Sequence, residues 1–158
     1  DGRKGILENG KEIYEKSDCA KCHRHGFIGT SVGPDLTTIA NRFTRNEVLE
    51  SIIYPSHIIS DQYQTKRVLT IDGKVLSGIL SQGANGTVMV RDSDLNEHVV
   101  AEQDIERIQP SKTSLMPSGL LNELSAEEIR DLMTFLGFVP SQNRVASDRS
   151  EISEVIIR

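Results

Sequence analysis

Hydrophobic residues near the start of the chain recur at three- and four-residue spacing, which is the spacing of one face of a helix. They predict an amphipathic helix over residues 3–17, with Gly10 in the middle of its apolar face. A glycine inside a helix costs about 1 kcal/mol relative to alanine. We therefore interpret Gly10 as a place where another part of the backbone comes close. The residues that share this face are Ile6, Leu7, Gly10, Ile13 and Tyr14.

Two more helices are predicted before the middle of the chain. Residues 36–43 predict a short helix, and residues 45–54 a clearer one. Thr44 and Glu47 have the spacing of a capping box, in which each side chain bonds the other's main-chain N–H group at the start of a helix. Pro55 then ends the helix, because proline cannot continue the hydrogen-bonding pattern.

The hydrophobic pattern changes to an alternation over residues 62–109, as in strands with one buried face. Asp72 and Gly73 lie between two alternating segments and predict a tight hairpin turn. Short strands are predicted to follow at "TVMVRD", "EHVVA" and "IERIQ", separated by polar turns. Residues 62–109 therefore predict a β-rich block between helical flanks.

A helical pattern returns at Ser125, which forms a second capping box with Glu128. Gly137 is the expected end of this helix. The tail, residues 141–158, is polar as far as "EISEVIIR", and its role is open. The apolar stripe of the final helix consists of Ile129, Leu132, Met133 and Leu136.

Composition adds bounds on size and class. The 158 residues are 37% hydrophobic and only 4% aromatic, with no Trp, so we expect one compact domain with a thin core. A net charge of −5 with mixed signs argues against a nucleic-acid surface. No apolar run approaches the roughly 18 residues of a membrane span. No signal peptide is visible and the chain begins at Asp1, so we expect a mature form or a piece of a longer protein.

Both cysteines of the chain lie in "CAKCH", residues 19–23. A thioredoxin-like disulfide site is disfavoured, because such a site follows a strand within a βαβ unit, whereas a helical pattern precedes this motif. Zinc needs about four ligands; Cys19, Cys22 and His23 or His25 supply three, and the remaining histidines are isolated.

The third alternative, covalently bound haem, requires Cys-x-x-Cys-His in strict adjacency, and the chain has it. Residues i, i+3 and i+4 share a face on one helical turn. Cys19 and Cys22 can therefore form thioethers to the two vinyl groups of a haem while His23 directs its imidazole at the iron. Haem is the interpretation that the residues favour most.

The sixth ligand of such an iron decides its chemistry, since His–Met ligation gives a closed, electron-transferring site and an open site binds small ligands. Met89 lies in a predicted strand and Met133 on the apolar stripe of the last helix, so both are expected to pack internally. Met116 lies in the irregular segment "SLMPSGLL" and is the predicted ligand.

The histidines outside His23 compete weakly for the sixth position. His25 is too close to His23 in sequence to reach the opposite face of the same haem. His57 follows "YPS" at a helix-to-strand junction and is expected at the surface, and His98 in a short strand is expected to pair across strands.

The ordered motifs are an N-terminal helix with Gly10 and Tyr14, then "CAKCH", "GPDL" (33–36), "SLMPSG" (114–119) and a final helix with Leu132 and Phe135. In this order they resemble class I cytochrome c. The resemblance is closer to the haem-binding domain typical of planctomycetes and verrucomicrobia, through "GPDLTTIANR", "IIYPSHIISDQY", "DGKVLSGIL" and "SLMPSGLLNEL", and it covers roughly residues 5 to 138.

The resemblance implies a mainly α fold, the class I cytochrome c fold, with helices around one covalently attached haem c and an inserted small β-sheet subdomain. The expected domain is 1–140, interrupted by a β-rich insertion at 58–112 and followed by the tail. It implies that Pro34 offers its carbonyl to the imidazole of His23 and that Arg42 reaches a haem propionate. We expect the pocket wall to be formed by Ile28, Val32, Leu36, Ile39, Leu115 and Leu120.

The function implied is that of a monohaem electron carrier with His23 and Met116 on the iron, not an enzyme in itself, because no residues have catalytic spacing. The alternative is a haem-based ligand sensor or weak peroxidase whose sixth ligand is displaceable. The family attaches haem outside the bacterial cytoplasm, so a periplasmic or other extracytoplasmic location is expected. The expected partner is a redox protein or a fused dehydrogenase module. The sequence leaves the donor, the acceptor, the reduction potential and the oligomeric state open.

Overall fold

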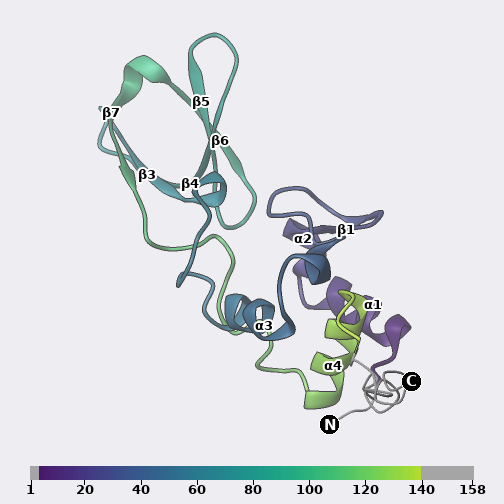
Figure 1. The fold of residues 1–158 in the computed structure, drawn as a ribbon. Helices are drawn as coiled ribbons and strands as arrows, with labels where there is room; N and C mark the ends of the chain where they lie inside the picture. The colour runs from purple at the N-terminus through teal and green to yellow at the C-terminus, as the bar shows by residue number, and fades with distance from the viewer. Residues whose placement is uncertain (1–3, 140–158) are drawn as a thin grey trace, which may run out of the picture.

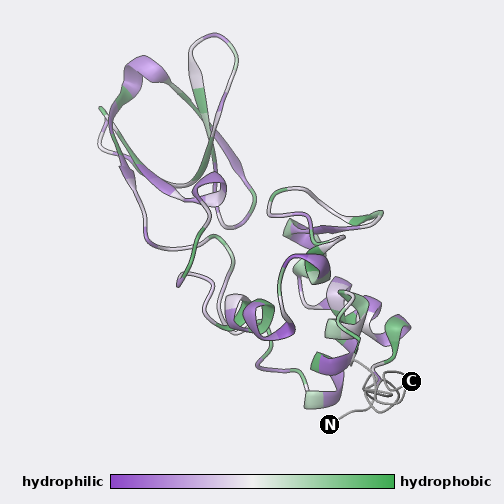
Figure 2. Cartoon of the chain, viewed as in Figure 1, coloured by the Kyte–Doolittle hydropathy of each residue, from purple (hydrophilic) through white to green (hydrophobic). Residues whose placement is uncertain are grey.

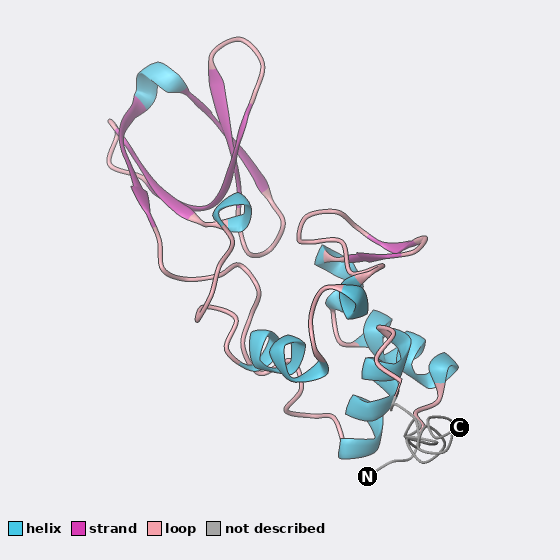
Figure 3. Ribbon diagram, viewed as in Figure 1, coloured by secondary structure: helices cyan, strands magenta, loops and turns pink. Residues whose placement is uncertain are grey.

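The computed structural model describes residues 4–139 of the chain. The α-helices lie apart from the larger sheet, which has short 3₁₀ helices beside it, and a two-stranded ribbon lies next to the CAKCH helix (Figures 1 and 3). The elements in chain order are α1 (Leu7–Lys16), α2 (Cys19–Cys22), β1 (Arg24–His25), β2 (Ile28–Gly29), η1 (Ile39–Asn41), α3 (Arg45–Ile53), η2 (Asp61–Tyr63), β3 (Lys66–Thr70), β4 (Val75–Gln82), β5 (Thr87–Arg91), β6 (Glu97–Ala101), η3 (Glu102–Asp104), β7 (Ile105–Pro110) and α4 (Ala126–Phe135), where η denotes a 3₁₀ helix.

The first and last helices, α1 and α4, cross at Gly10. A Cβ atom built on Gly10 would lie 2.1 Å from the main-chain oxygen of Asp131 and 2.8 Å from the Cβ of Phe135. The side chain of Asp131 accepts a hydrogen bond from the main-chain N–H of Ile6, at 2.8 Å, and so ties the start of α1 to α4. The predicted close approach at Gly10 is thus present, and its partner is the backbone of α4.

The helical core forms on the inner faces of α1, α3 and α4, each of which carries both hydrophilic and hydrophobic residues (Figure 2). Tyr14, Leu132 and Met133 are the largest fully buried side chains of this core. Partly buried apolar side chains from the CAKCH segment and the loops pack against it. The core residues are Ile13, Tyr14, Ile39, Val48, Leu132, Met133, Phe135 and Leu136.

The larger sheet has five antiparallel strands in the order β6-β5-β4-β3-β7. Strands β3 to β6 follow one another as a meander, and β7 returns to pair with β3, with Val68 opposite Ile108. Val68 and Val90 are fully buried, so the curled sheet has a core of its own. At the base of the sheet Thr65 Oγ1 donates to the carbonyl of Thr113 at 2.5 Å, which joins the chain segments that enter and leave it.

The expectation of a mainly α, class I cytochrome fold is wrong. Of the described residues, 31% lie in helices and 24% in strands, and the strands include a five-stranded sheet. The alternating segments were expected to add a small sheet to a helical domain. Instead they form a structure with its own buried valines, because β7 returns across about 35 residues to pair with β3.

Most of the predictions about helix ends are confirmed. Both capping boxes are confirmed, with the side chains of Thr44 and Ser125 each accepting from the third main-chain N–H of their helix. The last helix stops before Gly137, which has a φ of +95°. The helix expected at 36–43 is only the 3₁₀ turn Ile39–Asn41. The tail lies outside the described residues, and the domain boundaries stay predictions.

None of the helices between residues 4 and 139 has the length and apolar character needed to cross a bilayer.

Candidate functional site

The two cysteines of the CAKCH segment lie three positions apart on the single-turn helix α2. The left-handed backbone of Asp18, with φ +63°, turns the chain from α1 into this helix. His23 follows α2 with an extended backbone, and its main-chain N–H donates to the carbonyl of Cys19 at 2.9 Å. Both thiols are free and partly buried. One helical turn therefore carries both sulfur atoms next to the imidazole.

The imidazole of His23 is held by the loop that follows. Its Nδ1 lies 2.8 Å from the carbonyl oxygen of Pro34. Because a carbonyl can only accept, Nδ1 carries the proton and Nε2 keeps the lone pair that a metal could use. Burial lowers the pKa of His23, while the bond to Pro34 raises it. The net lowering favours the neutral ring, the form that binds metals.

Two glycines leave room for His23 and were not among the predicted site residues. A Cβ on Gly33 would lie 2.7 Å from Cε1 of the imidazole, so any larger residue would displace the ring. A Cβ on Gly29 would lie 2.1 Å from the carbonyl oxygen of His23, and Gly29 has a φ of +89°. The position of Gly33 next to Pro34 was the available signal, but sequence alone does not show which side chain it faces.

Tyr14 connects the site to the helical core. Its hydroxyl donates a hydrogen bond of 2.6 Å to the carbonyl of His23, and its side chain is fully buried. Burial is the main reason that its pKa is raised, so the hydroxyl stays a donor. The ring of His25 packs 4.5 Å from that of Phe135, which in turn lies 5.3 Å from Tyr14. His25 is therefore part of the packing between α1, α4 and the CAKCH segment.

The acidity of the two thiols argues against a disulfide-exchange site. Burial raises the pKa of Cys19 to about 11, and burial also raises the pKa of Cys22. Cysteines that exchange disulfides have lowered pKa values, because the thiolate is the nucleophile. The raised pKa values of both thiols therefore disfavour a thioredoxin-like disulfide site, as the sequence pattern also does.

Asp35 braces the loop that carries Pro34. Its carboxylate accepts from the main-chain N–H of Thr37 and from Nε of Arg24, each at 2.8 Å. Hydrogen bonds from Thr37, followed by the one from Arg24, hold the pKa of Asp35 well below its usual range. Arg42 donates to the carbonyl of Asp35 at 3.0 Å and is exposed, so it lies beside the same loop.

Met116 is half-buried in the irregular segment between β7 and α4. Its main-chain N–H donates to Oγ of Ser114 at 3.1 Å, and the N–H of Ser114 donates to Oγ of Ser56 at 3.1 Å. This segment therefore lies against the turn that follows α3, as Figure 1 also shows. The role of Met116 as an iron ligand stays a prediction.

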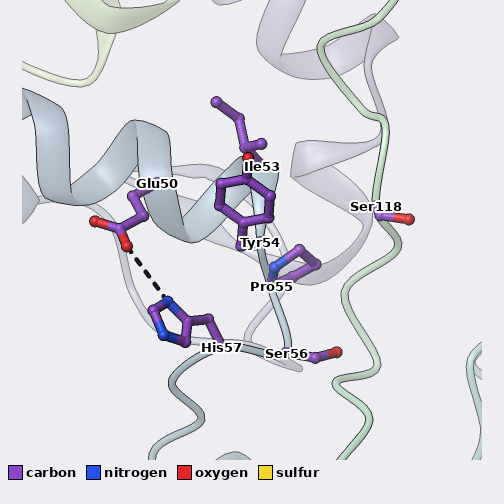
Figure 4. Close-up of a pocket in the computed structure, with 7 residues that line it drawn as sticks. All are labelled: Glu50, Ile53, Tyr54, Pro55, Ser56, His57 and Ser118. Carbon is purple, nitrogen blue, oxygen red and sulfur yellow. Dashed lines mark ion pairs between the residues drawn. The ribbon is translucent and has the colours of Figure 1, made fainter.

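A pocket of about 600 Å³ opens at the end of α3 (Figure 4). Nδ1 of His57 lies 3.3 Å from a carboxylate oxygen of Glu50, and both side chains are more than half exposed. No residue of the CAKCH segment lines this pocket, so it is not the immediate surroundings of the predicted haem motif. Its lining residues are Glu50, Ile53, Tyr54, Pro55, Ser56, His57 and Ser118.

His57 was expected at the surface, and His98 was expected to pair across strands, where it lies opposite Val90 of β5. His57 is exposed and faces Glu50, and Nε2 of His98 lies 2.8 Å from the carboxylate of Asp92. Met133 is fully buried in the helical core, as predicted. Within residues 4–139, no group of three or more His, Cys, Asp or Glu side chains could hold a metal ion.

The donor set around α2 fits a covalently bound haem. It offers two thiols on one turn, a neutral imidazole with a free Nε2, and a glycine that keeps the ring's side open. Of the six predicted wall residues, Ile39 is buried, and Ile28 and Leu36 pack against the helical core; Val32, Leu115 and Leu120 are partly buried.

Residues 7–74 match the family model of cytochrome c. This segment is a c-type cytochrome domain. Such a domain binds haem c covalently and serves electron transfer. The match includes α1, the CAKCH segment, Pro34 and Arg42, and it ends within the β3–β4 hairpin, before Met116 and α4. A search of curated proteins finds no match to the chain.

Proposed function

We propose that this cytochrome carries single electrons on one haem c, which Cys19 and Cys22 would attach and whose iron His23 and Met116 would bind. The single observation that carries the proposal is the hydrogen bond from Nδ1 of His23 to Pro34, which leaves Nε2 free beside two thiols. When bound, the haem supplies a metal centre that gains and loses one electron.

The chain's own residues keep the imidazole fixed between oxidation states. Pro34 fixes the tautomer and orientation of the His23 ring, and Tyr14 fixes the main chain of the same residue. Gly33 sets how closely the loop passes the ring. An iron ligand held from three sides moves little when the charge on the metal changes, and a small movement favours fast electron transfer.

The proposed role of Met116 is supported by its place in a loop that two serines attach to the end of α3. A thioether ligand stabilises ferrous iron, so it raises the reduction potential relative to a second imidazole. A partly buried methionine on an irregular segment can direct its sulfur without serving a helix face. We infer that Ser56 and Ser114 hold this segment in position.

We further propose an extracytoplasmic location, a partner or fused dehydrogenase module as the electron donor, and a domain over 1–140 in which 58–112 is an insertion. The extracytoplasmic location is supported by the covalent attachment of haem, which takes place outside the bacterial cytoplasm in the resembling family. The insertion is supported by the five-stranded sheet, whose strands lie between Lys66 and Pro110. The assignment of the chain to the planctomycete and verrucomicrobial subgroup likewise stays a prediction.

The test is Met116→Ala in the haem-loaded chain, with Met89→Ala on β5 as the matched control. The ferric protein should show the weak red charge-transfer band of methionine–iron bonding, and Met116→Ala should lose it, bind added cyanide faster and have a lower potential. Met89→Ala should keep the band. If Met116→Ala keeps the band and the potential of the parent, Met116 is not the ligand. If the parent protein already binds cyanide freely, the sensor or peroxidase alternative is favoured.

A further inference from the structure

Two of the three arginines on the five-stranded sheet have no hydrogen bond or ion pair from their side chains among the described residues. Arg67 on β3 and Arg107 on β7 are exposed and have no such partner there. The third, Arg91, pairs with Glu97 on the neighbouring strand, and Lys74 in the β3–β4 turn pairs with Asp72 at 2.9 Å. Other cations of this sheet thus form ion pairs with carboxylates, whereas Arg67 and Arg107 form none with the described residues.

The register of the sheet brings these two arginines together. Arg67 lies opposite Gln109 of β7, and Leu69 lies opposite Arg107. Arg67 and Arg107 are therefore diagonal neighbours, about 7–8 Å apart at their backbones and on one face of the sheet. Two like charges at this separation repel each other, and no carboxylate of the described residues pairs with either. The adjacent Glu106 alternates to the other face.

The same face has an apolar floor. Leu69 and Val75 lie opposite each other across β3 and β4, and with the two arginines and Gln109 they line a pocket of about 90 Å³. A water molecule takes about 30 Å³ of liquid volume, so the pocket has the size of a carboxylate and its methylene stem rather than that of a cofactor. The fork of a guanidinium matches a carboxylate with two parallel hydrogen bonds.

We propose that the face formed by Arg67, Leu69, Val75, Arg107 and Gln109, the arginine face, docks an acidic segment of a partner protein. The guanidinium groups bind the partner's carboxylates, Gln109 supplies an amide donor, and the apolar floor packs against the side-chain stems. Charge complementarity favours an acidic partner segment. The chain as a whole has a net charge of −5, but this face has two arginines that no described carboxylate neutralises.

The position of the arginine face suits a partner that must not cover the haem motif. In Figure 1, β7 lies at the edge of the sheet away from α1 and α4, whereas the CAKCH segment lies beside the helices. The strands that carry the arginine face are therefore not the ones beside α2. The proposal concerns a surface that the electron-transfer chemistry does not use, so it stands independently of the iron ligands.

The experiment is a titration of the ¹⁵N-labelled, haem-loaded chain with a tetraglutamate peptide, followed by amide NMR shifts. A tetraglutamine peptide and inorganic phosphate are the comparison probes. Shift changes should centre on β3 and β7, weaken with added salt, and be absent with tetraglutamine. R67Q/R107Q should bind tetraglutamate roughly tenfold or more weakly, R67K/R107K should fall in between because it keeps charge but not the fork, and R91Q should bind like the parent.

Several outcomes would overturn the proposal. They are no binding of tetraglutamate, equal binding by R67Q/R107Q, shifts centred on α2, and binding of phosphate as tight as that of the peptide, which would indicate a small-anion site. If R67Q/R107Q does not fold, the single variants R67Q and R107Q replace it, and each should bind several-fold more weakly than R91Q. Visible spectra should be identical in all variants, which separates this result from any failure at the haem.

Discussion

The hydroxyl group of Tyr14 donates a hydrogen bond of 2.6 Å to the main-chain carbonyl of His23, from a side chain that is fully buried. The bond joins α1, which crosses α4, to the histidine that follows the two cysteines of the CAKCH segment. The helical core and the proposed iron ligand are thus mechanically connected through one side chain.

Tyr14→Phe should therefore destabilise the protein and loosen His23. Removing the hydroxyl leaves a partly buried carbonyl without its donor, at a cost of about 1–3 kcal/mol in the free energy of unfolding. Guanidinium chloride unfolding measures this cost. Tyr54→Phe is the control, because Tyr54 is 62% exposed, and it should change stability by less than about 0.5 kcal/mol. Equal effects of the two substitutions would remove Tyr14 from the support of the site.

Gly33→Ala should act on the imidazole rather than on the backbone. The added Cβ would lie 2.7 Å from Cε1 of His23, so the ring must move away from the position that bonds Pro34. Overpacking of this kind costs about 1–3 kcal/mol. The resonances of the His23 ring should shift, together with the reduction potential of the haem-loaded protein.

Gly26→Ala is the matched control for Gly33→Ala. Gly26 has a φ of +60° and open space around its Cβ position, so alanine there introduces backbone strain without touching the ring. It should lower stability and leave the His23 resonances in place. Unchanged His23 signals in Gly33→Ala would contradict the contact between Gly33 and the ring.

Asp35 should make the free energy of unfolding decrease as the pH falls below the pKa of an ordinary aspartate. Hydrogen bonds from Thr37 and Arg24 depress the pKa of its carboxyl in the folded protein relative to the unfolded value near 3.8. A depressed folded pKa means that the stabilisation is present above the unfolded value and is lost as pH falls below it. Asp35→Asn should therefore be less stable than the parent at pH 7, with the difference shrinking toward pH 2 or 3.

Asp72→Asn serves as a second acid-sensitive variant on the β3–β4 hairpin. Lys74 and Thr70 hold the pKa of Asp72 at about 2, so its removal should also reduce the acid dependence of unfolding. Only Asp35→Asn should disturb the His23 resonances, because only Asp35 braces the loop of Pro34. Stability curves for the parent and Asp35→Asn that stay parallel between pH 5 and pH 2 would contradict this account.

Local rules predicted much of the secondary structure. The capping box of Thr44 and Glu47 depends on residues three apart, and the hairpin at Asp72 and Gly73 on two neighbouring residues, so both can be identified without tertiary contacts. The close approach at Gly10 was also predicted correctly. A glycine on the apolar face of a helix lowers helix stability, and it allows a second backbone to come close.

The failures are non-local. The pairing of β3 with β7 joins residues about 35 to 45 positions apart, and the sequence pattern does not encode which strands become neighbours. Five strands were therefore expected as a small addition to a helical fold, which was wrong. In the same way, the contacts of Gly33 and Tyr14 with His23 depend on a loop path that spacing alone does not give.

Covalent attachment of haem to this polypeptide is the central claim, and the most direct measurement is the alkaline pyridine spectrum of the chain after extraction with acidified acetone. The chain should be produced with the haem-attachment machinery, beside Cys19→Ala/Cys22→Ala as the control. The account predicts a c-type pyridine spectrum and one iron per chain that stay with the parent polypeptide and are lost from the double variant. A colourless, iron-free parent chain, or colour that the solvent removes completely, would contradict it.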